Sequence, residues 1–288
     1  MCHAPCVNTL KKPIPFRWLY CHRCWNFDVN WLECCTVHTG VCTKVYTGTV
    51  EGPMQQVRVI WRDSSLVVIE KPAGVPVHPP ETPDEGRAGV DLIRILRAQL
   101  GVRGYPVHRL DQATSGVMLW ALDSATAGKI QAQFQAGKIH KTYLAMVRGW
   151  LKGAGLVDSP LASEHDPSVL KPAFTRYEGL HHFELPVPDR QHATSRYSLV
   201  RAEPLTGRWH QIRRHLKRLS HPLIGDSVHG DGSHNRLWRA QTGDHRLYLL
   251  AWRLGLHHPH SGEWMEFQAR YSGVWHRVFD RAGYCPTK

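Results

Sequence analysis

The segment HRLDQATSGVMLWAL, residues 108–122, joins a polar turn to a short apolar run. Residues 117–122 are all apolar, and a run of this length between polar residues predicts a buried strand. Residues 114–116 are Thr-Ser-Gly, which supply hydroxyls for local backbone donors and a glycine for backbone freedom, so we expect a tight turn before the strand. The acidic and hydroxyl residues after the strand can cap a helix that continues to about residue 136.

Further strands and helices surround this segment without a regular strand–helix–strand rhythm. We therefore expect an α+β domain with a largely antiparallel mixed sheet flanked by helices. Proline recurs in residues 71–79, which predicts an extended loop. Residues 153–190 are rich in glycine, proline and polar groups and are expected to be mostly irregular with short strands. The remaining strands are expected at 57–61, 66–69, 140–147, 197–200, 247–256 and 264–267, and the remaining helices at 91–100, 209–219 and 274–282.

The composition is basic. The chain carries 36 Lys and Arg against 24 Asp and Glu, a formal net charge of +12 over 288 residues. This excess favours a polyanionic partner, most commonly a nucleic acid, but it does not distinguish an enzyme from a binding module. An apolar fraction of 42% and 11 tryptophans are enough for a sizeable core, which argues against disorder throughout. No apolar run reaches 18 residues and the first thirty residues lack a signal-peptide core, so we expect a cytoplasmic protein that does not enter a membrane.

The cysteines gather at one end, with seven of the eight in the first 42 residues. Because no targeting signal is present, a disulfide framework is disfavoured. Cys21 and Cys24 have the spacing of a zinc knuckle, but a second well-spaced pair is missing. We therefore favour a poorly ordered Cys-rich extension over residues 1–54, without a metal site, followed by one folded domain over residues 55–288.

Asp111 stands out by its surroundings. Between residues 101 and 157 the only acidic residues are Asp111 and Asp123, against seven Lys or Arg, and Asp123 is explained as a helix cap. A lone carboxylate held by a tight turn in basic surroundings is a candidate nucleophile or base. The alternative is a structural aspartate that makes an Asx turn and has no catalytic role.

A second constellation is GRWHQIRRHLKR, residues 207–218. One side of this predicted helix is apolar, and the other carries the basic residues; no acid occurs between residues 207 and 221. The simplest reading is a solvated basic face. The alternative is that these cations meet RNA phosphates and that one arginine pairs with Asp111.

Five stretches together resemble the ordered motifs of RluA-type pseudouridine synthases, and the resemblance covers roughly residues 57–288. The stretch HPLIGDSVHGDGSHNR (221–236), with His229 where many relatives carry tyrosine, looks most like the branch that modifies uridine 65 of tRNA. No S4-type RNA-binding module accompanies the motifs. The stretches are EKPAGVPVHP (70–79), HRLDQATSG (108–116), KTYLAMVRG (141–149), GRWHQIRRHL (207–216) and GDSVHGDGSHNR (225–236).

The resemblance implies a catalytic domain with a central RNA-binding cleft. In the implied reaction the C1′–N1 bond of a uridine is cut, the uracil turns over and a C1′–C5 bond forms, without a metal, a nucleotide cofactor or energy input. It makes Asp111 the essential carboxylate, acting either as a nucleophile at the sugar or as a base at C2′. Arg213 matches the arginine that pairs with this aspartate. Tyr143 matches the aromatic residue that packs on the uracil ring, and its hydroxyl is a candidate for helping to remove the C5 proton.

The resemblance also implies residues that bind the substrate. Arg109 matches an arginine that fills the gap left when the target base leaves its stack, an extrusion that costs a few kcal/mol. Lys141 is expected to touch phosphate or to face solvent. His108 and His210 are expected to position or pack rather than to act as the general base, and Arg214 belongs to the basic face.

The expected partner is RNA, preferably tRNA, and the expected state is a monomer. Two other functions stay open. One is a synthase of the same class that acts on ribosomal RNA. The other is an RNA-binding protein without catalysis, which shares the basic face but does not require Asp111, Tyr143 and Arg213 together; their joint presence disfavours it.

Overall fold

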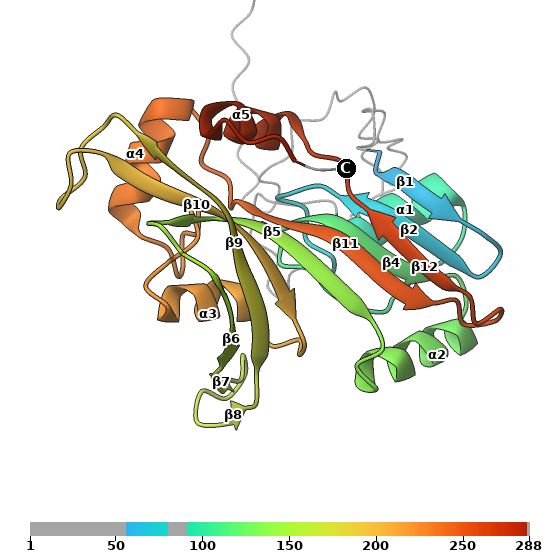
Figure 1. Cartoon of the computed structure of the whole chain (residues 1–288). Coiled ribbons are helices and arrows are strands. Elements are labelled where there is room, and N and C mark those ends of the chain that lie inside the picture. The colour runs from blue at the N-terminus through green and yellow to red at the C-terminus, as the bar shows by residue number, and fades with distance from the viewer. Residues whose placement is uncertain (1–55, 80–90, 287–288) are drawn as a thin grey trace, which may run out of the picture. The chain divides into compact units, whose positions relative to one another are not determined.

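The computed structural model describes residues 56–79 and 91–286 (Figure 1). The strands are β1 (Arg58–Arg62), β2 (Leu66–Lys71), β3 (Tyr105–Pro106), β4 (Ser115–Ala121), β5 (His140–Arg148), β6 (Ala154–Asp158), β7 (Leu161–Ala162), β8 (Leu170–Lys171), β9 (Phe174–Leu185), β10 (Ser195–Pro204), β11 (Leu249–His257) and β12 (Trp264–Gln268). The helices are α1 (Leu92–Leu100), α2 (Ser124–Gln135), α3 (Gln211–Arg218), α4 (Gly232–Thr242) and α5 (Gly273–Ala282).

Most strands belong to one sheet in the order β1-β2-β4-β11-β5-β10-β9-β6, with β12 paired to β11 and β3 to β4. Neighbouring strands run antiparallel, except that β4 and β11 run parallel where Leu250 pairs with Ser115 and Ala251 with Gly116. β7 and β8 form a separate hairpin. The prediction of an α+β fold with a largely antiparallel mixed sheet is confirmed.

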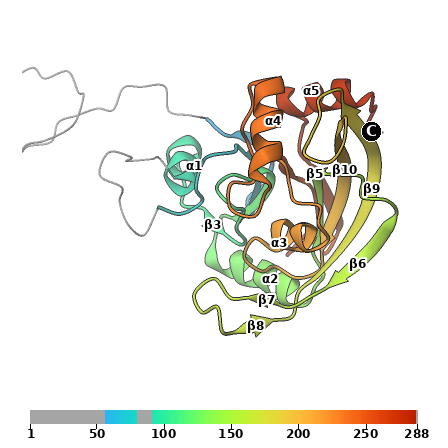
Figure 2. The same cartoon turned by 90° about the vertical axis from the view of Figure 1, so that its left-hand side faces the viewer.

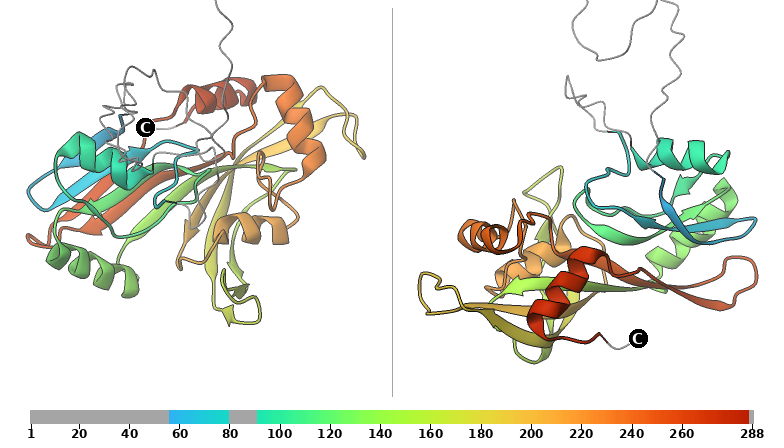
Figure 3. Two further views of the ribbon diagram at one scale, coloured as in Figure 1. Left: turned by 180° about the vertical axis from the view of Figure 1, so that it is seen from behind. Right: turned by 90° about the horizontal axis from the view of Figure 1, so that it is seen from above.

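Helices cover both faces of the sheet. In β4, Met118 and Trp120 pack with α1, whereas Val117 and Leu119 point to the other face, where α2 packs. The same alternation in β5 places Ala145 and Val147 against α3 and Leu144 and Met146 in the core that includes α5. Viewed from behind, α1 and α3 lie in front of the sheet (Figure 3, left), and Figure 2 shows the same layering from the side.

The helix ends follow from capping residues that the sequence supplies. The side chain of Asp91 accepts the backbone N–H of Arg94 at 2.9 Å, and α1 ends at Gly101, which has a φ of +70°. Asp123 likewise caps α2 by accepting the N–H of Thr126 at 2.8 Å. The predictions for these two helices and for the strand between them are confirmed.

The prediction that residues 153–190 are mostly irregular was wrong. β9 pairs with β10 from Thr175 to Leu185 and, with β6, extends the sheet beyond β10. The alternation in β9 is masked because several of its polar residues are half-buried rather than exposed. α4 was not predicted either, since only His234 and Trp238 of its eleven residues are buried and the apolar spacing is weak.

The predictions for residues 1–54, including the choice between a loose extension and a zinc knuckle, lie outside the described residues. Within the described ranges, no helix is both long and apolar enough to cross a bilayer. In those same ranges, no three His, Cys, Asp or Glu side chains are grouped so as to hold a metal ion.

Candidate active site

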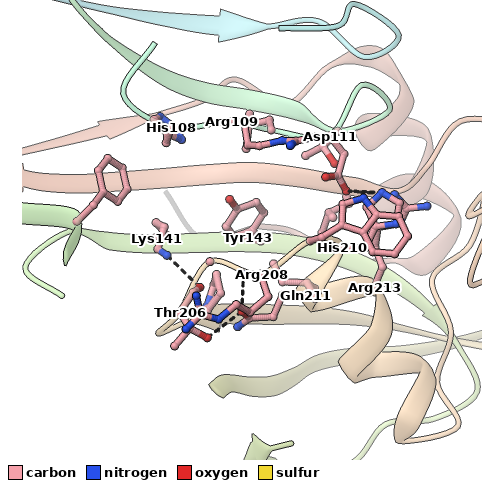
Figure 4. Close-up of a pocket in the computed structure, with 18 of the residues that line it drawn as sticks. His108, Arg109, Asp111, Lys141, Tyr143, Thr206, Arg208, His210, Gln211 and Arg213 are labelled. Atoms are coloured by element: carbon pink, nitrogen blue, oxygen red, sulfur yellow. Dashed lines mark hydrogen bonds and ion pairs between the residues drawn. The ribbon is translucent and has the colours of Figure 1, made fainter. Parts of the chain in front are cut away.

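A cavity of about 600 Å³ opens on the sheet face that carries α1 and α3. Tyr143 of β5 packs against the apolar clusters of both helices, so the cavity lies where the two clusters meet. We call it the Asp111 cavity. Its lining comes from the turn before β4, the end of α2, β5, the β7–β8 hairpin, and the segment from the end of β10 into α3 (Figure 4). The polar residues among them are His108, Arg109, Asp111, Thr114, Gln135, Lys141, Tyr143, Glu164, Thr206, Arg208, His210, Gln211 and Arg213.

Asp111 and Arg213 meet in this cavity although 102 residues separate them. The Nη1 of Arg213 donates to the Oδ2 of Asp111 at 3.1 Å, and the Asp111 side chain is 21% exposed (Figure 4). Among the described residues, no backbone N–H donates to the Asp111 carboxylate, so it does not make an Asx turn. The contact pairs the carboxylate with a buried positive charge and fixes its orientation in the cavity.

Asp226 holds Arg213 in place. Its two carboxylate oxygens accept the Nε and Nη2 of Arg213, each at 2.7 Å, and its side chain is fully buried. Burial lowers the pKa of Arg213, but hydrogen bonds and charge from Asp226, and then from Asp111, outweigh that effect and raise it. Burial raises the pKa of Asp226, but Arg213 and the N–H groups of His229 and Val228 outweigh that effect, so the pKa is lowered. Arg213 is therefore a fixed cation shared by two carboxylates.

Lys71 pins the turn that carries Asp111. This lysine is fully buried, and its Nζ donates to the carbonyl oxygens of Pro72, Gln112 and Thr114 at 2.9, 3.0 and 2.9 Å. Three carbonyls match the three protons of an ammonium group. The N–H of Thr114 closes the turn on the carbonyl of Asp111 at 3.0 Å. The expectation that the Thr114 hydroxyl binds a local donor was wrong, because this buried hydroxyl has no partner in the described part of the chain.

Tyr143, Lys141 and His108 also line the cavity. Burial raises the pKa of Tyr143, and the charge of Asp111 raises it further, so the phenol stays protonated. Burial lowers the pKa of Lys141 to about 8, and its Nζ donates to the carbonyl of Thr206 at 3.2 Å. Burial, and then the charge of Lys141, lowers the pKa of His108 to about 3, and its Nε2 accepts the N–H of Leu119 at 2.9 Å. His108 is thus a neutral residue that anchors its loop to β4.

His210 lies beside Asp111 in the cavity wall. Its Nε2 lies 3.7 Å from the Oδ2 of Asp111, and its Nδ1 lies 3.0 Å from the Nε2 of His229. The ring stacks on Trp209 with 4.0 Å between centroids. His210 adopts a φ of +50°, a conformation uncommon for a residue with a side chain, at the start of α3. This conformation turns the chain from the cavity wall into the helix that carries Arg213.

The two remaining predicted residues, Arg109 and Arg214, differ in their relation to the cavity. Arg109 lines the cavity, is exposed, and its Nη1 lies 3.2 Å from the Oε2 of Glu164 in the β7–β8 hairpin. Arg214 does not line the cavity. Its Nη1 donates to the carbonyl of Ala162 at 2.8 Å, and its guanidinium lies over Trp209 at 5.7 Å. The structure thus gathers seven of the eight predicted residues and places Arg214 against the hairpin instead.

Comparison with known proteins identifies the family. Residues 65–218 match the family described as RNA pseudouridylate synthase. The chain belongs to this family. It is 37% identical over 241 residues to the tRNA pseudouridine synthase C of Vibrio cholerae, covering 78% of this chain and 96% of that protein. It is 40% identical over 235 residues to the protein of the same name from Salmonella typhi, covering 78% and 90%.

Solved structures share the fold of this pseudouridylate synthase. The human RNA pseudouridylate synthase domain containing 4 aligns with a TM-score of 0.60 and 23% identity, over 78% of this chain and 93% of that one. The human domain containing 1 aligns with a TM-score of 0.57 and 24% identity. The enzyme is therefore an isomerase that acts on RNA.

Two residues that build the site of this pseudouridylate synthase were not singled out from its sequence. Asp226 stands in GDSVHG, where a Gly-Asp-Ser run is typical of a turn, and only its burial reveals that it binds Arg213. Lys71 stands before a proline-rich loop, where a lysine is normally solvated. The available signal was indirect: both lie in stretches that carry the family resemblance.

Proposed function

We propose that this enzyme converts uridine 65 of tRNA to pseudouridine, with Asp111 as the reacting carboxylate. One observation carries the assignment of the residue. Asp111 is the carboxylate that a buried arginine from a distant helix contacts at 3.1 Å, inside a cavity that Tyr143 also lines. The tRNA substrate is supported by relatives named tRNA pseudouridine synthase C, and position 65 by the resemblance that includes His229.

In this mechanism the C1′–N1 bond of the target uridine breaks, the uracil turns, and C5 bonds to C1′ while its proton is lost and N1 gains one. Asp111 attacks C1′ or removes the C2′ proton. Arg213 pairs with Asp111 and aims it. Tyr143 packs on the uracil ring; because its pKa is raised, its phenol acts as a neutral group rather than as a base.

The other lining residues bind RNA around the target. Arg109 is exposed at the rim and fills the gap left by the extruded base. Lys141 contacts phosphate, His108 and His210 hold the walls, and Arg214 supports the basic face. We further propose that the enzyme works as a monomer in the cytoplasm and needs no nucleotide cofactor.

The test is pseudouridine formation by Asp111→Asn. We expect turnover on tRNA to fall by about 10³-fold or more while RNA affinity changes little, because the amide keeps the shape but can neither attack nor accept a proton. Asp280→Asn, an exposed position on α5, is the matched control and keeps wild-type turnover. Wild-type turnover in Asp111→Asn would refute the role of this residue.

A second comparison uses two cations of α3. Arg213→Ala should lower turnover at least about tenfold more than Lys217→Ala, because Lys217 is exposed and Arg213 contacts Asp111. Equal losses in two folded variants would contradict a specific Arg213–Asp111 partnership.

Two further measurements identify the RNA substrate and distinguish the two possible reactions of Asp111. Pseudouridine mapping of total RNA with and without the enzyme should show a change at position 65 of tRNA; a change confined to ribosomal RNA would reject the tRNA assignment. A target uridine deuterated at C2′ should react more slowly if Asp111 removes that proton and at the same rate if it attacks C1′.

A further inference from the structure

A second cavity, of about 530 Å³, lies apart from the Asp111 cavity. Its wall comes from the end of β5 and the residues that follow, from the turn between β9 and β10, from the residue after α3 and from the start of α4. We call it the Trp150 cavity. The residues that matter below are Arg148, Trp150, Arg190, Arg196, Ser220 and His234.

The cations of this cavity are not all neutralised. Arg148 pairs with Asp231 at 2.5 Å and also donates to the carbonyl of Ser220 at 3.0 Å. Asp189 accepts the backbone N–H groups of Gln191 and His192, both at 2.7 Å. In the described part of the chain, by contrast, neither Arg190, which is exposed, nor Arg196 has a carboxylate within ion-pair distance. The cavity therefore presents positive charge that its own carboxylates do not compensate.

Arg196 is fixed by Trp150 and has a donor nitrogen without an acceptor in the described part of the chain. Its guanidinium makes a cation–π contact with Trp150, with 4.5 Å from Cζ to the ring centroid. Its Nε is buried and has no hydrogen-bond partner among the described residues. His234, which is 7% exposed, also lines the cavity with a buried Nδ1 that lacks a partner there. Burial lowers the pKa of His234, and its Nε2 lies 3.7 Å from the Oδ2 of Asp189, so its Nδ1 is the acceptor nitrogen of a neutral ring and adds no donor. An unpaired buried donor is costly, so the Nε–H of Arg196, beside the uncompensated charge of Arg190, suits a bound anion.

Aromatic and guanidinium planes are also what proteins use to stack on unpaired bases. Trp150 is 37% exposed, and its Nε1 donates to the carbonyl of Phe183 at 3.3 Å, which fixes the indole. An anion site next to a fixed aromatic platform matches a nucleotide of RNA better than an acidic peptide, which offers charge but no base.

The two cavities lie at opposite ends of α3. His210, before the first turn, lines the Asp111 cavity, and Ser220, after the last turn, lines the Trp150 cavity. A helix of eight residues is about 12 Å long, which corresponds to about four nucleotides of one strand in a duplex. An RNA strand that enters one cavity can therefore reach the other.

We propose that the Trp150 cavity binds a phosphodiester of the substrate RNA several nucleotides away from the target uridine, through Arg190 and Arg196. The site contacts a part of the RNA outside the reacting nucleotide and so contributes to substrate selection. This site rests on the proposed function only in that tRNA serves as the probe below.

The test is tRNA binding and turnover by the full-length double variant Arg190→Ala/Arg196→Ala. With unfractionated bacterial tRNA at 0.1 M salt we expect Kd to rise about tenfold and the slope of log Kd against log salt to fall by about 0.8, since one phosphate contact is lost. With the tRNA substrate, KM should rise while kcat at saturation stays unchanged. On an oligonucleotide with only two nucleotides on each side of the target, wild type and variant should be equal.

Arg62→Ala/Arg97→Ala removes the same charge at the other end of the sheet and is the matched control. Arg190→Ala alone, at an exposed side chain, keeps the test valid if the double variant does not fold.

Equal Kd values for the Trp150-cavity variants and the control would overturn the proposal. So would an equal loss on the short oligonucleotide, or tight binding of inorganic phosphate to wild type with no change in tRNA affinity in the variants. Binding is measured without turnover, so an enzyme that binds tRNA through this cavity but forms no pseudouridine would refute the proposed function and leave this site standing.

Discussion

At the scale of single residues, the most consequential contact is the one between Asp226 and Arg213. Asp111 is partly exposed, whereas Asp226 is fully buried and binds two nitrogens of the same guanidinium. Asp226 thus fixes the arginine, and the arginine fixes Asp111. A fully buried residue thereby sets the geometry of a carboxylate that lines the Asp111 cavity.

Asp226→Asn tests this arrangement. The amide cannot balance the buried guanidinium, so we expect a loss of about 3 kcal/mol in the free energy of unfolding and a fall in kcat larger than the rise in KM. Urea unfolding and steady-state kinetics measure the two effects. Asp158→Asn, at an exposed strand end, should change neither. If Asp226→Asn were as active and stable as wild type, the arginine would not depend on this partner.

His210 predicts a pH dependence. Burial lowers its pKa to about 4; the charge of Asp111 opposes this effect, and Arg213 and His229 add to it. Since the unfolded value is about 6.5, unfolding takes up a proton between pH 4 and 6.5. This contribution to stability is complete above pH 6.5 and is lost as the pH falls through that window. We expect His210→Gln to lose less stability than wild type between pH 6.5 and 4.5, by on the order of 1 kcal/mol. Unfolding curves at several pH values measure the difference, and exposed His245→Gln should follow wild type.

At the scale of elements, the parallel contact between β4 and β11 depends on Gly116. Its φ is +122°, and a Cβ there would lie 2.1 Å from the carbonyl oxygen of Ala251. Gly116→Ala should therefore cost about 3 kcal/mol or more and displace the neighbouring Asp111 turn. Gly137 also has a positive φ, +65°, but open space around it, so Gly137→Ala should cost only about 1 kcal/mol. Thermal unfolding of both variants compares their losses of stability. Similar losses would mean that the close contact with Ala251 in β11 does not add to the cost of Gly116→Ala.

Elements with strong local signals could be predicted, and those supported by tertiary contacts could not. The apolar run of β4 and the capping aspartates of α1 and α2 can each be recognised from a few neighbouring residues in the sequence. β9 contains Gly179 and adjacent histidines at 181 and 182, and pairing on both sides makes it a strand. Asp111, Tyr143 and Arg213 could be singled out through the family resemblance, but Asp226 required the three-dimensional contact with Arg213.

At the scale of the whole molecule, the described residues already contain both cavities. The relatives match 78% of the chain, and the family match begins at residue 65. We therefore expect deletion of residues 1–54 to leave pseudouridine formation unchanged, as measured by turnover on tRNA with the full chain as reference. A collapse of activity or yield would show that the extension takes part in folding or in RNA binding.

The burial of Lys71 has a practical consequence. Its amine is enclosed by three carbonyl oxygens and has no exposed surface, so an acylating reagent reaches it only when the chain between β2 and β4 loosens. Mass spectrometry of time-resolved lysine labelling should find this amine far slower to react than exposed Lys138. The labelling rate at this one lysine then reports how often the turn that carries Asp111 opens, and RNA bound over that turn should lower this rate.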